Sequence, residues 1–212
     1  RSPSRGLGDV YKRQILDWVA NHTSPDARWI EERPADWYVR DSLGNTIVQY
    51  DWTDIAKLDY GNADMRAAMA AAMRFWLNRG IDGFRCDMVF MVPLAFWHWA
   101  IPQVKSLYPH IMFIGEIYDV GLYRPFLDYG CFDYLYDKVN LYDTLVGIET
   151  HGWSAAQLTG CWQTVDGIGD RMLNFLENHD EVRFGSKAYA GDSLRVIPSL
   201  VTSSMISKGP VM

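Results

Sequence analysis

The chain has 212 residues, 49% of them hydrophobic and 22% charged, which is typical of a folded protein and not of a disordered, fibrous or disulfide-rich one. Its 20 Lys and Arg against 26 Asp and Glu give a net charge of -6, so we expect no nucleic-acid partner. No apolar run approaches the roughly 18 residues of a membrane span, and three scattered cysteines indicate neither a zinc site nor a disulfide framework. We therefore expect a soluble chain without a membrane span.

Residues 1–14 differ in composition from everything that follows. They are rich in Arg, Lys, Gly and Ser, and they lack the apolar stretch of a signal peptide. We interpret them as a segment foreign to the fold, so that the native N-terminus is missing and no compartment is assigned. The fold is expected in residues 15–212.

From residue 15 onward, short apolar runs alternate with longer amphipathic ones. Strands are expected at 15–19, 81–86, 111–115, 131–136 and 172–176, and another strand opens at 210–212. Helices are expected at 65–79, capped from Asn62, at 94–107 and at 193–206. Between the first strand and the first helix lies a long polar, turn-rich insert, 23–60, of a kind that is usually functional. This alternation predicts βαβ units and a parallel sheet.

Polar residues gather at the carboxyl ends of the expected strands. In a parallel sheet or barrel the loops at that end converge on one mouth, so we expect residues from distant parts of the chain to line one cleft. The residues concerned are Asp17, Asn21, His22, Arg85, Asp87, Glu116, Asn178, His179 and Asp180.

Two of these carboxyl groups, Asp87 and Glu116, end neighbouring strands at a spacing that one βαβ unit allows. Two adjacent carboxyls cannot both ionise cheaply, so one keeps its proton and can donate it while the other is a nucleophile. Arg85 lies on the same strand face as Asp87 and can hold it ionised. This arrangement predicts that Asp87 attacks and Glu116 donates a proton. The alternative interpretation is an Arg85–Asp87 pair that only closes the end of a barrel.

Four segments carry a resemblance to a known family. They are 17–22 (DWVANH), 83–87 (GFRCD), 115–119 (GEIYD) and 175–183 (FLENHDEVR). In this order and spacing they resemble the four signature regions of the α-amylase family of glycoside hydrolases, family 13 type. The resemblance covers residues 15–212 and implies an α/β fold, the (β/α)8 TIM barrel, that acts on α-glucosidic bonds with retention.

The resemblance also implies how much of the barrel is present. The chain enters the family pattern at the third strand, so we expect an incomplete barrel with strands 3 to 7 and the start of strand 8. The insert at about 23–60 then corresponds to a short B domain after strand 3. Missing strands leave open sheet edges and an unfilled interior, so we expect the fragment to be poorly stable and inactive alone.

Three carboxylates take reacting roles by resemblance. Asp87 resembles the family's nucleophile, Glu116 its general acid/base, and Asp180 the third carboxylate, which holds sugar hydroxyls and stabilises the oxocarbenium-like transition state. Retention requires the carboxyl groups of Asp87 and Glu116 to lie about 5–5.5 Å apart, with a covalent glycosyl intermediate on Asp87.

The remaining matches are substrate-binding or positioning residues. His22 and His179 resemble the two subsite histidines, and a neutral imidazole can donate a hydrogen bond to a sugar hydroxyl. Asn178 precedes His179, Arg85 is the arginine two residues before the nucleophile, and Asp17 resembles a positioning residue at the barrel mouth.

The family's calcium site has one candidate ligand here, Asn21. The family often completes that site with an Asp late in the B domain, but the corresponding position is Lys57. A lysine cannot ligate a hard cation and can replace its charge instead, which argues against calcium. No cofactor is expected to be required.

Aromatic residues of the insert have two interpretations. Trp29, Trp37, Tyr38 and Trp52 can stack on glucose rings or form a small core within the insert, and core packing is the preferred prediction for each.

The predicted function is hydrolysis of α-1,4-glucosidic bonds in starch-derived glucans or maltodextrins. Transglycosylation shares the same covalent intermediate and remains an alternative. A non-catalytic glucan-binding relative is a further alternative, but such relatives typically lose carboxylates, whereas this chain has Asp87, Glu116 and Asp180.

Overall fold

The computed structural model describes residues 12–212, which divide into two compact units. Unit 1 comprises the described residues up to Glu116 together with Tyr129–Phe132, and unit 2 comprises Ile117–Asp128 and Asp133–Met212. Of the segment interpreted as foreign, residues 1–11 lie outside the described residues. Gln14, which directly precedes β1, contacts Asp82 twice: its N–H donates to Asp82 Oδ2 at 2.7 Å, and its carbonyl accepts from the Asp82 N–H.

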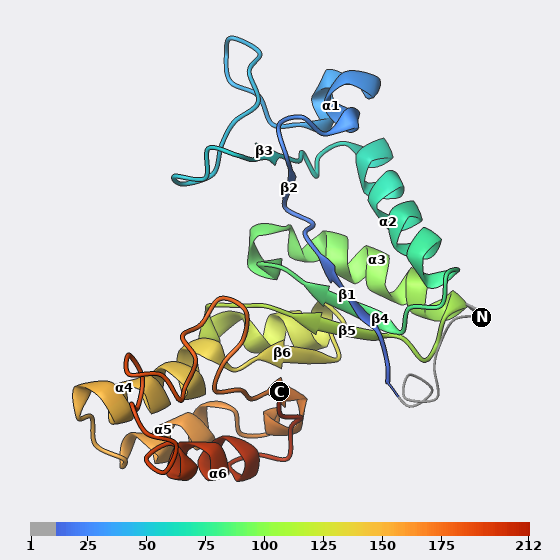
Figure 1. The fold of residues 1–212 in the computed structure, drawn as a ribbon. Helices are drawn as coiled ribbons and strands as arrows, with labels where there is room; N and C mark the ends of the chain where they lie inside the picture. The colour runs from blue at the N-terminus through green and yellow to red at the C-terminus, as the bar shows by residue number, and fades with distance from the viewer. Residues whose placement is uncertain (1–11) are drawn as a thin grey trace. The chain divides into compact units, whose positions relative to one another are not determined.

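Unit 1 is built on three parallel strands, with β4 between β1 and β5 (Figure 1). Every residue of β4 is buried, as expected for a strand covered on both faces. In the register of the sheet, Asp17 lies opposite Arg85, and Cys86 lies opposite Gly115. The strands are β1 (Ile15–Trp18), β4 (Gly83–Cys86) and β5 (Met112–Gly115).

The first residue of β4, Gly83, is required by the close approach of β5. A Cβ on Gly83 would lie 2.2 Å from the carbonyl oxygen of Met112, so no other residue fits without moving the strands. The register that follows brings Asp87 and Glu116 to neighbouring positions just beyond the two strands, where the Glu116 N–H donates to the Cys86 carbonyl at 2.9 Å.

Two helices of unit 1 pack on each other and carry much of its core. Asn62 caps α2 by accepting a hydrogen bond from the Met65 N–H at 2.9 Å, as predicted. Trp97 of the second helix is fully buried and donates its indole N–H to the Val89 carbonyl at 3.0 Å. The helices are α2 (Ala63–Leu77) and α3 (Leu94–Leu107), the latter with the predicted bounds.

The insert that begins after β1 contains little regular structure. Trp37 and Tyr38 are buried, and the Trp29 ring meets Trp37 edge-on at 5.1 Å, which confirms core packing for Trp37 and Tyr38. That the insert is a B domain stays a prediction. Its elements are the antiparallel pair β2 (His22–Thr23) and β3 (Ala56–Lys57), the helix α1 (Arg28–Glu32) and the turn η1 (Ala35–Trp37).

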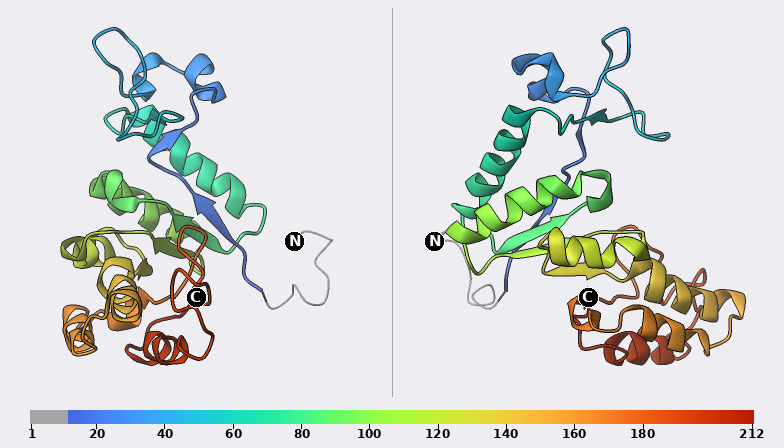
Figure 2. Two further views of the ribbon diagram at one scale, coloured as in Figure 1. Left: turned by 60° about the vertical axis from the view of Figure 1, so that its left-hand side comes forward. Right: turned by 180° about the vertical axis from the view of Figure 1, so that it is seen from behind.

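Unit 2 pairs β6 and β7 in parallel, and Figure 2 shows its helices lying next to one another. Val211 forms a parallel bridge with Asn174, where the sequence predicts the opening of another strand. The elements are β6 (Tyr134–Tyr136), β7 (Met172–Leu173), α4 (Asp143–His151), α5 (Gln157–Thr164) and α6 (Ile197–Met205). Short 3-10 or π-helical turns also occur in both units. They are η2 (Val89–Met91), η3 (Val120–Leu122), η4 (Pro125–Tyr129), η5 (Lys138–Tyr142) and η6 (Gly169–Arg171).

Some predicted bounds are wrong for identifiable reasons. The strand expected from residue 131 begins only at Tyr134, because Cys131 has a left-handed backbone with φ of 67°. The helix expected from residue 193 begins at Ile197, with Pro198 in its first turn. Within residues 12–212, no helix combines the length and hydropathy that a bilayer crossing requires.

Candidate active site

The centre of the unit 1 site is the guanidinium of Arg85, which contacts three carboxylates. Its Nη1 lies 2.9 Å from Asp17 Oδ1 and 2.8 Å from Asp87 Oδ1, and its Nη2 lies 2.6 Å from Glu116 Oε1. The Arg85 side chain is only 10% exposed, so its pair with the buried Glu116 is shielded from water, whereas Asp17 is 54% exposed. The predicted contact between Arg85 and Asp87 is therefore present, and the structure adds direct contacts to Asp17 and Glu116.

Glu116 is the most deeply buried of the three carboxylates, with 2% of its side chain exposed against 23% for Asp87. Besides the Arg85 contact, its Oε2 accepts the backbone N–H of Met88 at 3.0 Å. The carboxylate is thus fixed at one oxygen by an ion pair and at the other by a backbone hydrogen bond. In this structure, Glu116 therefore lies against Arg85 and the turn at Met88.

Met88 makes that second contact from a strained backbone. Its φ of 41° and ψ of 52° are left-handed, a conformation that is uncommon for a residue with a side chain. The following residue, Val89, donates its N–H to the Glu116 carbonyl at 2.9 Å. The turn after Asp87 thus forms hydrogen bonds with both the side chain and the backbone of Glu116. A strained backbone such as that of Met88 is often found where function requires a fixed geometry.

His22 extends the unit 1 site toward the insert. Burial lowers the pKa of its imidazole, and the negative charges of Asp87 and Asp54 offset part of that shift. Its Nδ1 lies 3.3 Å from the Asn21 side-chain amide, and its ring lies 5.9 Å from that of Trp52. A neutral imidazole beside Asp87 and a half-buried indole are groups suited to a sugar hydroxyl and a sugar ring.

The calcium prediction concerns the same corner of unit 1. Asn21 is 2% exposed, and its carbonyl accepts the Leu58 N–H at 3.1 Å. Lys57, which stands where the resemblance would place an Asp, lies opposite His22 in the pairing of β2 with β3. Lys57 is therefore close in the backbone to Asn21. The described residues 12–212 include no group of three His, Cys, Asp or Glu side chains placed to share a metal ion.

Unit 2 brings together the other predicted residues on the loop after β7. The side-chain oxygen of Asn178 accepts the N–H groups of Asp180 and Glu181, each at 2.9 Å. His179 Nε2 lies 3.1 Å from Asp180 Oδ2, and these two side chains are 58% and 50% exposed. The loop therefore presents Asp180 and His179 to solvent while Asn178 shapes the turn beneath them.

Sequence reasoning missed a polar pair at the end of β6. Asp137 is 2% exposed and accepts hydrogen bonds from the Tyr123 hydroxyl, the Asn140 amide and the Leu141 N–H. Lys138, the next residue, pairs with two carboxylates of unit 2. The signal was available, since Asp137 and Lys138 directly follow an expected strand.

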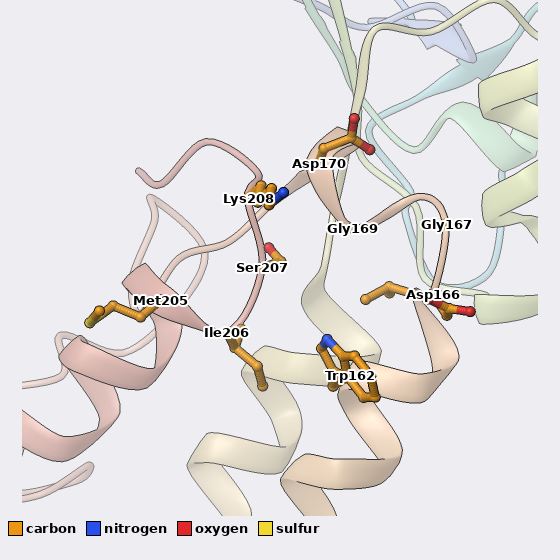
Figure 3. A pocket seen from close by; sticks show the side chains of 10 residues that line it. Trp162, Asp166, Gly167, Gly169, Asp170, Met205, Ile206, Ser207 and Lys208 are labelled. Atoms are coloured by element: carbon orange, nitrogen blue, oxygen red, sulfur yellow. The ribbon is translucent and has the colours of Figure 1, made fainter.

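A cavity of about 640 Å³ lies elsewhere in unit 2, between the ends of α5 and α6. Figure 3 shows Trp162, Asp170 and Lys208 among the side chains around it. None of the predicted site residues lines it, so it does not bear on their chemistry.

Comparison with known sequences finds one matching family model and relatives of two kinds. The family model of the alpha-amylase catalytic domain matches residues 11–209. An alpha-1,4-glucan:maltose-1-phosphate maltosyltransferase of Methylacidiphilum infernorum is 34% identical over 121 residues, which are 53% of this chain and 17% of that protein. Alpha-amylase MalA of Haloarcula japonica is 26% identical over 181 residues, 80% of this chain and 26% of the relative. The chain thus spans about a quarter or less of the length of these relatives.

Comparison with solved structures gives the fold. An alpha-amylase from Lactobacillus plantarum superposes with a TM-score of 0.80 at 27% identity, covering 93% of this chain and 49% of that one. An alpha-amylase from Geobacillus thermoleovorans, complexed with acarbose, gives 0.77 at 26% identity, covering 94% and 48%. The predicted fold class, the (β/α)8 barrel, is confirmed by this likeness, and the chain spans about half the length of those structures.

Proposed function

We propose that this chain carries the reacting groups of an α-glucan-cleaving enzyme. The reason is that the chain belongs to the alpha-amylase catalytic domain family, glycoside hydrolase family 13. The substrates are α-1,4-linked glucans such as starch-derived maltodextrins, and the anomeric configuration is retained. The observation that carries this proposal is the shared contact of Arg85 with Asp87 and Glu116, which gathers a nucleophile and an acid/base around one cation. The names of the relatives, alpha-amylases and maltosyltransferases, support the same class of substrate.

The reaction proceeds in two displacements. Glu116 gives a proton to the glycosidic oxygen while a carboxylate oxygen of Asp87 attacks the anomeric carbon, so that one C–O bond breaks and another forms. Glu116 then takes a proton from water, whose oxygen displaces Asp87 from the same carbon. Arg85 holds the attacking carboxylate of Asp87 in place through their ion pair and balances the charge on Glu116 after its proton has left. The left-handed turn at Met88 keeps the acid/base in place through both steps.

In this proposal, further residues bind the sugar. The neutral imidazole of His22 donates to a hydroxyl near the reacting carbon, and Trp52 offers its ring to a sugar face. Asp180 and His179 hold further hydroxyls, and Asp17 keeps Arg85 in position from the neighbouring strand. Hydroxyl contacts of this kind strengthen as positive charge develops in the transition state.

Transfer to a sugar acceptor is the second candidate. It is favoured by the maltosyltransferase that is 34% identical over 121 residues. Water and a sugar hydroxyl compete for the same glycosyl intermediate, so product analysis with maltooligosaccharides distinguishes them. Shorter products alone indicate hydrolysis, whereas products longer than the substrate indicate transfer.

The test of the nucleophile uses the full-length protein. We expect Asp87→Asn to lower kcat by about 10⁴-fold or more, because the amide cannot form the glycosyl intermediate. Asp166→Asn, an exposed change in unit 2, is the matched control and should leave kcat unchanged. A fluorinated α-glucosyl fluoride, whose intermediate hydrolyses slowly, should label the peptide that contains Asp87. A label on another peptide, or near-normal activity in Asp87→Asn, would contradict the proposal.

We also propose that Lys57 replaces a structural calcium beside Asn21. A positive side chain on β3, close in the backbone to Asn21, can supply the charge that the ion would bring. The melting temperature should then not change when a calcium chelator is added. A chelator-dependent loss of stability would show that an ion is bound after all.

A further inference from the structure

Lys138 lies in a cage of two carboxylates and two aromatic rings at the carboxyl end of β6. Its Nζ lies 2.8 Å from Asp143 Oδ1 and 3.1 Å from Glu181 Oε1. The same nitrogen lies 5.7 Å from the ring centroid of Tyr118 and 5.2 Å from that of Tyr142, distances typical of cation–π contacts. Both Lys138 and Glu181 are 19% exposed, so their ion pair is largely shielded from water.

The charge on Lys138 persists at neutral pH. Burial alone would lower its pKa, but the hydrogen bonds and charges of Asp143 and Glu181 outweigh burial and raise the pKa above its usual value. Glu181 has a second partner, since it also bonds the hydroxyl of Tyr142, and burial together with Glu181 raises the pKa of that phenol. The Glu181 carboxylate is therefore held by two side chains of one turn, η5.

Glu181 belongs to the loop 177–183, which presents Asp180 and His179. Within the loop, Asn178 accepts the N–H groups of Asp180 and Glu181, and Glu177 pairs with Arg183 at 2.9 Å. These bonds shape the turn, and each of them connects two residues of the same loop. The Glu181 side chain, by contrast, ties the loop to the end of β6, one residue from Asp180.

On the basis of the proposed function, we propose that Lys138 is a positioning residue for Asp180. It does not touch the sugar: it holds Glu181, and through the adjoining peptide it fixes where the Asp180 carboxylate stands. Because Asp180 is half exposed and lies on a loop, its own surroundings constrain it less than strands constrain Asp87 and Glu116. A displacement of about 1 Å at a group that binds the transition state can cost on the order of 100-fold in rate.

The experiment compares Lys138→Met, Lys138→Arg and Lys187→Met in the full-length protein. Met keeps the apolar stem of the side chain but removes the charge, so kcat/KM should fall by about 10- to 100-fold, mostly through kcat. Arg can still pair with Glu181 and should restore at least half of the activity. Lys187 is exposed in the same unit and undergoes the same change of charge, so Lys187→Met should behave as the parent protein.

A second measurement separates positioning from general support of the fold. In an Asp180→Asn background, Lys138→Met should cause less than a twofold further loss of kcat, because the group that it positions is already disabled. Equal losses in both backgrounds would show that Lys138 acts elsewhere. If Lys138→Met does not fold, Glu181→Gln removes the same ion pair with little change of shape. It should lower kcat/KM by about 10- to 100-fold alone and by less than twofold in the Asp180→Asn background.

The two proposals fail in different ways. Full activity in both Lys138→Met and Glu181→Gln, alongside an inactive Asp87→Asn, would overturn the role of Lys138 and leave the proposed function standing. Normal activity in Asp87→Asn would instead overturn the proposed function, and with it the basis of this inference.

Discussion

The two units hold their candidate catalytic carboxylates in different ways. In unit 1, Asp87 and Glu116 stand just beyond two paired strands and share one buried guanidinium, that of Arg85. In unit 2, Asp180 stands on a loop, half exposed, in a turn shaped by the Asn178 side chain. The unit 1 arrangement depends on the balance of charges around a buried guanidinium, and the unit 2 arrangement depends on the conformation of a loop. The same type of substitution should therefore affect stability in unit 1 and leave it nearly unchanged at the unit 2 loop.

The largest expected effect on stability comes from removing the shared cation. Arg85→Met leaves the Glu116 carboxylate, 2% exposed, without its ion pair, and breaking a buried pair in this way costs about 3–5 kcal/mol. Urea unfolding measures the loss. Arg28→Met is the control, because the Arg28–Glu32 pair is 85% and 48% exposed and contributes at most about 0.5 kcal/mol. Similar losses in both variants would refute the contrast between buried and exposed charges.

An intermediate effect is expected from Asp137, the one strongly buried carboxylate that we find in unit 2. Burial raises its pKa from 3.8 to about 6. The folded state thus keeps a proton that the unfolded chain has lost, so this contribution to stability is full below about pH 4 and disappears as the pH rises through about 6. The change amounts to about 2–3 kcal/mol.

Unfolding in urea at several pH values between 4 and 7 tests this expectation. Asp137→Asn should remove this part of the pH dependence, because the amide does not titrate. Asp166→Asn, an exposed change in the same unit, should keep it. An unchanged slope in Asp137→Asn would mean that another group carries the proton.

The smallest expected effect on stability is that of Asp180→Asn. The side chain is 50% exposed, and its backbone N–H bond to Asn178 survives the change, so the free energy of unfolding should shift by less than about 0.5 kcal/mol. Activity should nevertheless fall by about 100-fold or more if Asp180 stabilises the transition state. Calorimetry and kcat on the same preparation compare the two effects. A large loss of stability would place Asp180 in a structural role.

Strongly patterned segments could be predicted from the sequence. The helix α3 has the predicted bounds, since it begins directly after Pro93 and its buried apolar residues recur at helical spacing from Phe96 to Val104. The side chains expected at the carboxyl ends of β1, β4 and β5 are brought into contact, because the register of parallel strands leaves them little freedom. The roles of these residues in the reaction remain predictions.

Other features depended on tertiary contacts that no local pattern reveals. The helices α4 and α5 were missed because Gly147 and Gly160 weaken their helical pattern, yet Gly147 is needed where the Trp153 ring passes over it. The contact of Arg85 with Glu116 joins side chains 31 positions apart and could not be distinguished from a simple Arg85–Asp87 pair. Both features are determined by packing between elements that are distant in the sequence.

Gly83 bears on the proposed reaction although it lies four positions before Asp87. Because its missing side chain lets β4 approach the Met112 carbonyl, it sets the lateral spacing of the two strands whose ends carry Asp87 and Glu116. A retaining glycosidase works only when that spacing brings its two carboxyl groups to about 5–5.5 Å. If the proposed reaction holds, a missing side chain at the start of β4 therefore helps to set the distance between the two carboxyl groups that flank the anomeric carbon.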